Sequence, residues 1–212
     1  MYHVKPNKLH ESLAILNVLN NEIQLISELI DEADELCKKE NNSKNFVRYY
    51  VLYGKIVIHA ISFLDEFDIL KSLQRENQNI KKLYDSMKPL NRRLRKWHDL
   101  EKYRNTYFAH NFRDSKSNNR FILFDDYITT LNAPISHFDI KLIAKIVDLM
   151  YNEINDFFKN EMIVAIFALA DSRNENENLR TEKYSKSVKT LDEFNAEIKI
   201  LEDELIKIKE NY

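Results

Sequence analysis

Residues that make tight turns are scarce in this sequence. Its 212 residues include one glycine, Gly54, and only three prolines. Glycine and proline supply the backbone conformations of β-hairpin turns, and glycine also lets a loop approach a bound phosphate closely. Their scarcity argues against a β-sandwich and against a glycine-rich phosphate-binding loop. The sequence therefore predicts an all-α fold.

Cysteine is rare as well, and long apolar runs and a large net charge are missing. Cys37 is the only cysteine, which argues against a disulfide framework and against a cysteine-based zinc site. The sequence has no run of about 18 apolar residues, and residues 1–6 lack the features of a secretion signal. We therefore expect a cytoplasmic protein without membrane contact. The formal net charge of −2 gives no overall attraction to nucleic acid.

The spacing of apolar residues predicts an elongated bundle of four or five helices. Apolar side chains recur every seven positions from Leu9 to Cys37, which predicts a first helix over about residues 6–39. A wide aromatic face predicts a second helix over residues 46–70, and this helix is expected to be central. The polar stretch at residues 74–79 is expected to form a loop.

Two further long helices are expected in the second half of the chain. The third covers about residues 80–103, with a break or kink at Pro89. The fourth begins at a capping box formed by Ser136 and Asp139 and reaches about residue 170. Between these helices, residues 111–135 are expected to form a small hairpin or an ordered irregular insertion.

The end of the chain has a separate character. We expect a helical domain at residues 1–171, an exposed polar linker at 172–189 and an amphipathic helix at 190–212. Thr190 and Glu193 form a capping box at the start of that helix. Its apolar residues alternate spacings of three and four: Leu191, Phe194, Ile198, Leu201, Leu205 and Ile208. This helix either packs on the first helix of the same chain or pairs with another protein.

A short run at residues 103–110 carries the most chemical information. Leu90, Trp97 and Arg104 recur every seven residues, so the arginine is expected on the apolar face of the third helix. An arginine there costs several kcal/mol unless an anion or carbonyl groups pair with it. A substrate phosphate is one such anion. Arg92 and Arg93 also precede a histidine, His98, at similar spacing, but they belong to a basic cluster on a solvated face.

In this run, Arg104 and Asn105 are followed by His110, with five residues between the arginine and the histidine. This motif between long helices of an all-α chain resembles the HEPN superfamily, and among its groups most the AbiU-like bacterial abortive-infection proteins. The resemblance covers about residues 46–170. It implies an RNA-binding protein or a metal-independent endoribonuclease that acts as a homodimer, in phage defence or as the toxin of a toxin–antitoxin pair. Some HEPN relatives carry a modified tyrosine two positions after the histidine, where this chain has Phe112.

The residues themselves fit metal-independent RNA cleavage, in which the 2′-hydroxyl attacks the neighbouring phosphate. His110 would act as acid or base near neutral pH, Arg104 would hold the phosphate, and Asn105 would orient the reacting group. Single-stranded bases would stack on aromatic side chains, and the RNA backbone would meet basic ones. These expected RNA-binding residues are Arg92, Arg93, Arg95, Lys96, Tyr103, Tyr107 and Phe112. No metal or cofactor is expected.

Helix geometry links this site to a homodimer. In a continuous helix, side chains six positions apart point about 120° away from each other, so Arg104 and His110 of one chain would not converge. Facing copies of the motif, or a helix that ends before His110, would remove the mismatch.

The alternative function is that of a non-enzymatic helical scaffold that binds partners through its heptad helices. In that case Arg104 pairs with Asp65 or Glu66 of the second helix, and His110 caps a helix end. His59 lies at helical spacing among apolar residues, so it is interpreted as a hydrogen-bonded core histidine.

Overall fold

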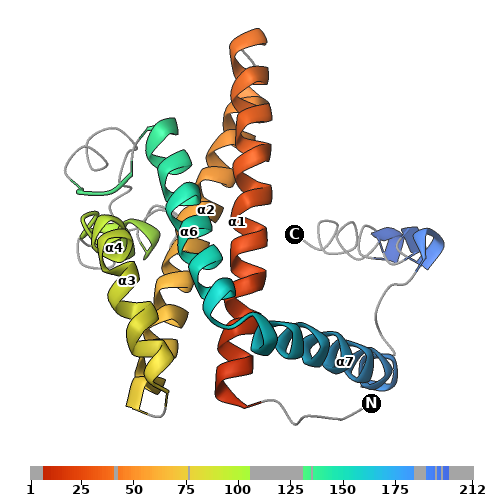
Figure 1. The fold of residues 1–212 in the computed structure, drawn as a ribbon. Helices are drawn as coiled ribbons and strands as arrows, with labels where there is room; N and C mark the ends of the chain where they lie inside the picture. Colours follow the sequence, from red (N-terminus) through yellow and green to blue (C-terminus); the bar gives the residue numbers. More distant parts are fainter. Residues whose placement is uncertain are drawn as a thin grey trace, which may run out of the picture. The chain divides into compact units, whose positions relative to one another are not determined.

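The computed structural model describes most of the chain, and it is helical (Figure 1). The described residues are 7–40, 43–75, 77–105, 131–134, 136–183, 190–193, 195–196 and 198–200. Nearly all of them lie in helices and none lies in a strand, which confirms the predicted all-α fold. The chain divides into two compact units, Met1–Ala168 and Leu169–Tyr212.

Helices α1 (Lys8–Lys39) and α2 (Ser43–Ser72) pack along each other as a long hairpin (Figure 1). The seven-residue apolar pattern of α1 is buried as predicted, with Leu16, Ile23 and Ile30 at 0% exposure. Helices α2 and α6 (His137–Phe157) pack against the apolar side of α1. The seam of α1 is therefore already occupied within the first unit.

Helix α1 begins at a cap that the sequence analysis did not predict. The Asn7 side chain accepts the His10 amide at 3.1 Å, and the Asn7 amide donates to His10 Nδ1 at 3.2 Å. This is a capping box in which histidine takes the place of the usual glutamate or glutamine. The usual sequence signal of a capping box, a glutamate or glutamine at the third helical position, is therefore absent at this helix start.

The aromatic face of α2 is the centre of the core, as expected. Phe63 and Phe67 are buried at 0% and 1% exposure. A short 3₁₀ helix η1 (Leu73–Arg75) follows, and α3 (Gln78–Leu94) starts earlier than predicted. Its start is set by Asn77, whose side chain accepts the Asn79 amide at 2.9 Å.

The third predicted helix is broken at a different place from the one expected. Helix α3 continues through Pro89 and ends at Leu94. Pro89 is exposed, so water can satisfy the carbonyl that its missing N–H leaves free. Residues 95–99 then form a turn that buries Trp97 at 8% exposure, and the short helix α4 (Leu100–Tyr103) follows. Of the predicted break or kink at Pro89, the break does not occur. An exposed helix tolerates the proline, whereas burial of Trp97 redirects the chain after Leu94.

The fourth predicted helix is in fact two helices, α6 and α7 (Lys159–Lys183). Between them Phe158 leaves the helical conformation, with φ −127° and ψ 36°, and its side chain is buried at 1% exposure. Helix α7 continues to Lys183, beyond the helix end predicted near residue 170, so residues 172–183 of the predicted linker are helical. That segment contains neither glycine nor proline, and nothing in its backbone chemistry stops a helix.

Both capping boxes predicted from the sequence are present. Ser136 Oγ accepts the Asp139 amide at 3.1 Å, and Thr190 Oγ1 accepts the Glu193 amide at 3.2 Å. Of the insertion predicted at 111–135, only residues 131–134 are described, and they are not in regular secondary structure. Among the described helices, none combines the length and apolar character needed to cross a membrane.

Candidate functional site

Arg104 and Asn105 form a π-helical turn directly after α4. The Arg104 Nε donates a hydrogen bond to Asn105 Oδ1 at 3.0 Å. One of its terminal nitrogens, Nη2, lies 3.6 Å from Glu101 Oε1. The Arg104 side chain is 26% exposed and that of Glu101 is 74% exposed. The guanidinium is therefore held at Nε while its Nη atoms keep donors for a further ligand.

The ion pair expected in the structural alternative is not formed. Among the described residues, the carboxylate that pairs with Arg104 is Glu101, and neither Asp65 nor Glu66 contacts it. A pair at 3.6 Å with an exposed partner contributes little free energy and is readily exchanged for another anion. Leu90, Trp97 and Arg104 were predicted to share one face of a continuous helix. They do not, because the chain turns at residues 95–99. Arg104 is nevertheless largely covered.

Tyr103 anchors this turn to the core. It is 2% exposed, and it lies close enough to Tyr53 on α2 to influence the Tyr53 hydroxyl. The Tyr53 hydroxyl in turn donates to the carbonyl of Pro134. Burial, together with the neighbouring Tyr103, holds the pKa of Tyr53 far above its ordinary value. The expectation that Tyr103 stacks on an RNA base is corrected, because its ring is enclosed by protein.

A second contact joins the chain on either side of residues 106–130. The Asp99 amide donates to the Asn132 carbonyl at 3.1 Å, and the Asn132 amide donates to Asp99 Oδ2 at 2.9 Å. Leu131 and Ala133 are buried at 8% and 7% exposure beside this contact. The described residues that flank 106–130 are therefore tied together beside the start of α4.

The structure brings together only part of the predicted site. Arg104 and Asn105 are in direct contact. His110, Tyr107 and Phe112 lie outside the described residues. The predicted convergence of the arginine and the histidine therefore stays a prediction.

The four basic residues predicted to contact RNA fall into two groups. The Arg93 guanidinium lies over the Trp97 ring, 4.2 Å from its centroid. Arg95 pairs with Asp68 at 2.7 Å, and its Nε donates to Asn91 Oδ1 at 2.8 Å. Arg93 and Arg95 thus help to fix the turn after α3. Arg92 and Lys96 are exposed and form no ion pair with the described residues.

His137, the first residue of α6, was not among the residues predicted from the sequence. Its Nε2 lies 3.2 Å from an Asp31 carboxylate oxygen, and its ring stacks on Tyr49 with centroids 6.3 Å apart. Lys141 Nζ also contacts Asp31. The available signal was the capping box at Ser136, which places the next residue in the first turn of a helix. His137 joins α1, α2 and α6 near the segment that Tyr53 holds.

His59 lies between α1 and α2, with Nδ1 3.5 Å from Glu22 Oε2. Its side chain is 20% exposed, so it is an interface residue and less buried than the predicted core histidine. Burial lowers the pKa of His59, and this outweighs the opposite effect of Glu22. Within the described part of the chain, no group of three His, Cys, Asp or Glu side chains is placed to hold a metal ion.

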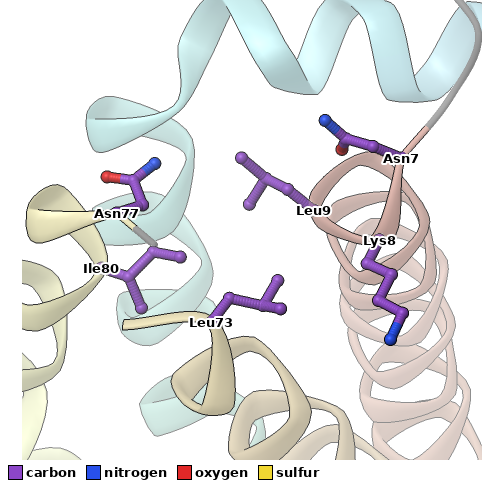
Figure 2. Close-up of a pocket in the computed structure, with 6 residues that line it drawn as sticks. All are labelled: Asn7, Lys8, Leu9, Leu73, Asn77 and Ile80. Atoms are coloured by element: carbon purple, nitrogen blue, oxygen red, sulfur yellow. The ribbon is translucent and has the colours of Figure 1, made fainter. Parts of the chain in front are cut away.

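A pocket of about 310 Å³ lies between the start of α1, η1 and the start of α3 (Figure 2). Its lining is Asn7, Lys8, Leu9, Leu73, Asn77 and Ile80. Asn7 and Asn77 both cap their own helices, so their side-chain oxygens are already engaged. The pocket contains none of the residues predicted for the site.

The chemistry of the site thus rests on a fixed, partly covered arginine beside a basic helix end. Such an arginine binds an anion with two oxygens well, because its Nη groups donate in parallel. Comparison with known proteins adds no assignment: no family model, curated protein or solved structure matches this chain.

Proposed function

We propose that this protein is a HEPN-like RNA-binding protein or metal-independent endoribonuclease that acts as a homodimer. The observation that supports this most is the state of Arg104. Asn105 fixes its guanidinium at Nε, and its single carboxylate contact among the described residues is the exposed Glu101. A phosphate can replace Glu101 at little cost, because exposed ion pairs are weak.

In the proposed reaction, a ribose 2′-oxygen attacks the adjacent phosphorus and the bond to the 5′-oxygen breaks. The products are a 2′,3′-cyclic phosphate and a 5′-hydroxyl. His110 takes the proton from the 2′-hydroxyl or gives one to the leaving oxygen. Arg104 stabilises the extra negative charge on the phosphoryl oxygens, and Asn105 orients the guanidinium. Two facing copies would supply an acid and a base together.

The test is incubation of the purified protein with mixed cellular RNA in excess EDTA. We expect cleavage that leaves 2′,3′-cyclic phosphate ends, and we expect Arg104→Ala/His110→Ala to abolish it. A matched control is Arg48→Ala/His98→Ala, which removes the same two residue types from exposed positions. It should cleave at the rate of the unmodified protein.

Folding and oligomeric state of each variant are checked by circular dichroism and sedimentation. Equal cleavage by all three proteins would point to a contaminating nuclease and remove the support for this site. RNA binding without cleavage by the unmodified protein would leave the binding function and reject the ribonuclease. Absence of both activities would reject the proposal.

One observation favours the scaffold function as a second candidate. In the C-terminal helix, the heptad residues Leu191 and Ile198 are 73% and 38% exposed. Exposed apolar residues at heptad spacing are typical of a surface that pairs with another helix. If the scaffold function is correct, Ile198→Asp abolishes association in sedimentation experiments, while Arg104→Ala leaves it unchanged.

A further inference from the structure

Positive charge is concentrated in one part of this acidic chain. Residues 78–105 contain nine basic and three acidic side chains, a net charge of +6. The rest of the chain has 23 basic and 31 acidic side chains, a net charge of −8. The two values account for the overall −2. Helices α3 and α4 therefore form a positive segment on a negative protein, and such asymmetry is an electrostatic footprint of nucleic-acid binding.

Four of these basic residues form a line along α3. Lys81, Lys88, Arg92 and Lys96 are all exposed, at spacings of seven, four and four residues. Three of them lie on α3 itself, and Lys96 lies in the turn that directly follows it. A helix rises 1.5 Å and turns 100° per residue, so the part of the line on α3, from Lys81 to Arg92, is about 17 Å long and spans a sector of about 40°. Their charges thus lie in single file.

The surroundings leave this line largely free to bind. Asp85 is the one acidic residue of α3, and Lys88 pairs with it at 2.7 Å. Lys81, Arg92 and Lys96 form no ion pair with the described residues. Arg95 beside them is committed to Asp68, and Arg93 to Trp97. The line therefore lies beside two basic side chains that already have partners, and one carboxylate, Asp85, lies next to it.

The line also leads toward the candidate site. Helix α4 follows α3 after a turn of five residues, and Arg104 comes directly after α4 (Figure 1). A single file of cations matches one sugar–phosphate backbone, whereas an RNA duplex presents two backbones on either side of each groove. The aromatic rings of α3 and of the turn after it are engaged: Trp97 is buried under Arg93, and Tyr84 stacks on Phe67. Binding here would be electrostatic and tolerant of base sequence.

We propose that Lys81, Lys88, Arg92 and Lys96 hold the backbone of single-stranded RNA and guide it to Arg104. This inference rests on the proposed RNA function and deepens it: the substrate is unpaired RNA that lies along α3. It adds Lys81 and Lys88 to the RNA-binding residues, and it assigns Arg93 and Arg95 to the support of the turn.

The test measures binding of a fluorescent 12-nucleotide oligouridine to the full chain by anisotropy, in EDTA, at several salt concentrations. The variant Lys81→Gln/Lys88→Gln/Arg92→Gln/Lys96→Gln removes the line. The matched control Lys39→Gln/Lys55→Gln/Lys159→Gln/Lys199→Gln removes the same charge from exposed positions elsewhere. A thermal melt of each protein confirms folding.

Each phosphate contact on a single strand contributes about 0.7 to the slope of log affinity against log salt, so loss of the line should lower the slope by about 2.8. We expect at least a tenfold loss of affinity at low salt, with less than a threefold loss in the control. Equal losses in both variants would overturn the inference, as would equal binding of an RNA duplex or displacement of RNA by polyglutamate at equal charge. Absence of binding by the unmodified protein would also overturn it.

These outcomes separate this inference from the proposed reaction. If the protein cleaves RNA but the line variant binds oligouridine normally, the guiding role of α3 fails and the ribonuclease stands. If binding depends on the line but no RNA is cut, the RNA-binding role of the four basic residues is supported and the proposed ribonuclease activity is rejected. The Arg104→Ala/His110→Ala variant should still bind oligouridine in a salt-dependent manner.

Discussion

Tyr103 and Arg104 are neighbours with opposite environments. Tyr103 is buried against Tyr53, whereas a quarter of the Arg104 side chain reaches solvent. The buried tyrosine fixes the backbone, so the arginine next to it has few positions available. This is how a short helix of four residues holds a charged group in place. Fixing the arginine before it meets a ligand reduces the entropy lost on binding.

His59 should make stability depend on pH near neutrality. Its pKa is lowered by burial, so the unfolded chain binds a proton at a higher pH than the folded protein does. Stability should therefore fall as the pH drops below about 6.5, by up to about 1.4 kcal/mol per unit of pKa difference. Urea unfolding of the protein and of His59→Asn at pH 5 to 8 measures this.

In that experiment, His59→Asn should lose less stability than the unmodified protein between pH 7 and pH 5. The control is His98→Asn, because the His98 side chain is 69% exposed. It should keep the original pH dependence. The same pH dependence in His59→Asn and the unmodified protein would contradict the prediction.

Tyr53 should control stability at alkaline pH. Burial raises its pKa, so above about pH 10 the unfolded chain releases a proton that the folded protein keeps. Stability should then fall by about 1.4 kcal/mol per pH unit for this group. Tyr53→Phe should weaken that fall, and at neutral pH it should cost about 1–3 kcal/mol because the Pro134 carbonyl loses its donor. Thermal melts from pH 7 to pH 11 test both effects, with Tyr84→Phe as a control that keeps the alkaline dependence.

At the scale of helices, α1 and α6 meet through a polar ladder. Asn17 Oδ1 accepts the Tyr151 hydroxyl, the Gln24 side chain donates to the Ala144 carbonyl, and Asp31 contacts His137. On each helix these positions are seven residues apart. A shift of one turn would unpair every rung, so the ladder sets the antiparallel register that apolar contacts alone would leave loosely specified.

The first rung can be tested by removing one or both partners. Asn17→Leu leaves the Tyr151 hydroxyl without its 2.6 Å acceptor, and we expect a loss of about 1 kcal/mol. Asn17→Leu/Tyr151→Phe should recover at least half of that loss, because no polar group is then left unpaired. Urea unfolding measures both variants. A double variant as unstable as Asn17→Leu would show that packing, and not hydrogen bonding, is what the rung contributes.

Helix starts were predictable where the signal is local. Ser136 with Asp139 and Thr190 with Glu193 lie within one turn of each other, so no distant contact is needed to form the cap. Helix ends were not predictable in the same way. The breaks after Leu94 and at Phe158 bury Trp97 and Phe158, and that gain depends on residues far away in the sequence.

At the scale of the whole molecule, the buried side chains that the structure describes all belong to the first unit. Burial is described after Ala168 for residues 169–171, 190–193, 195–196 and 198–200, and none of these side chains is buried. A chain that ends at residue 171 should therefore unfold cooperatively, with a Tm within about 3 °C of the full chain. Differential scanning calorimetry tests this.

The matched comparison is a chain that ends at residue 157. It lacks Phe158, Met162 and Ala165, which are buried at 1%, 2% and 1% exposure. Loss of two large core side chains should cost several kcal/mol and lower the Tm by more than 10 °C. Similar melting of both truncated chains would show that α7 contributes nothing to the core.

The sequence by itself determined the helical class, the buried faces of α1 and α2, and two helix starts. These depend on periodicity and on contacts within one turn, which are properties of the chain alone. The extension of α7 to Lys183 accords with a segment that contains neither glycine nor proline. Tertiary structure decided where α3 and α6 end, and that Arg104 meets Glu101 and Asn105 in place of Asp65 or Glu66. It also separated Tyr103 from the predicted RNA surface. In each of these cases the outcome depends on which side chains the packed helices enclose, and spacing along the sequence does not contain that information.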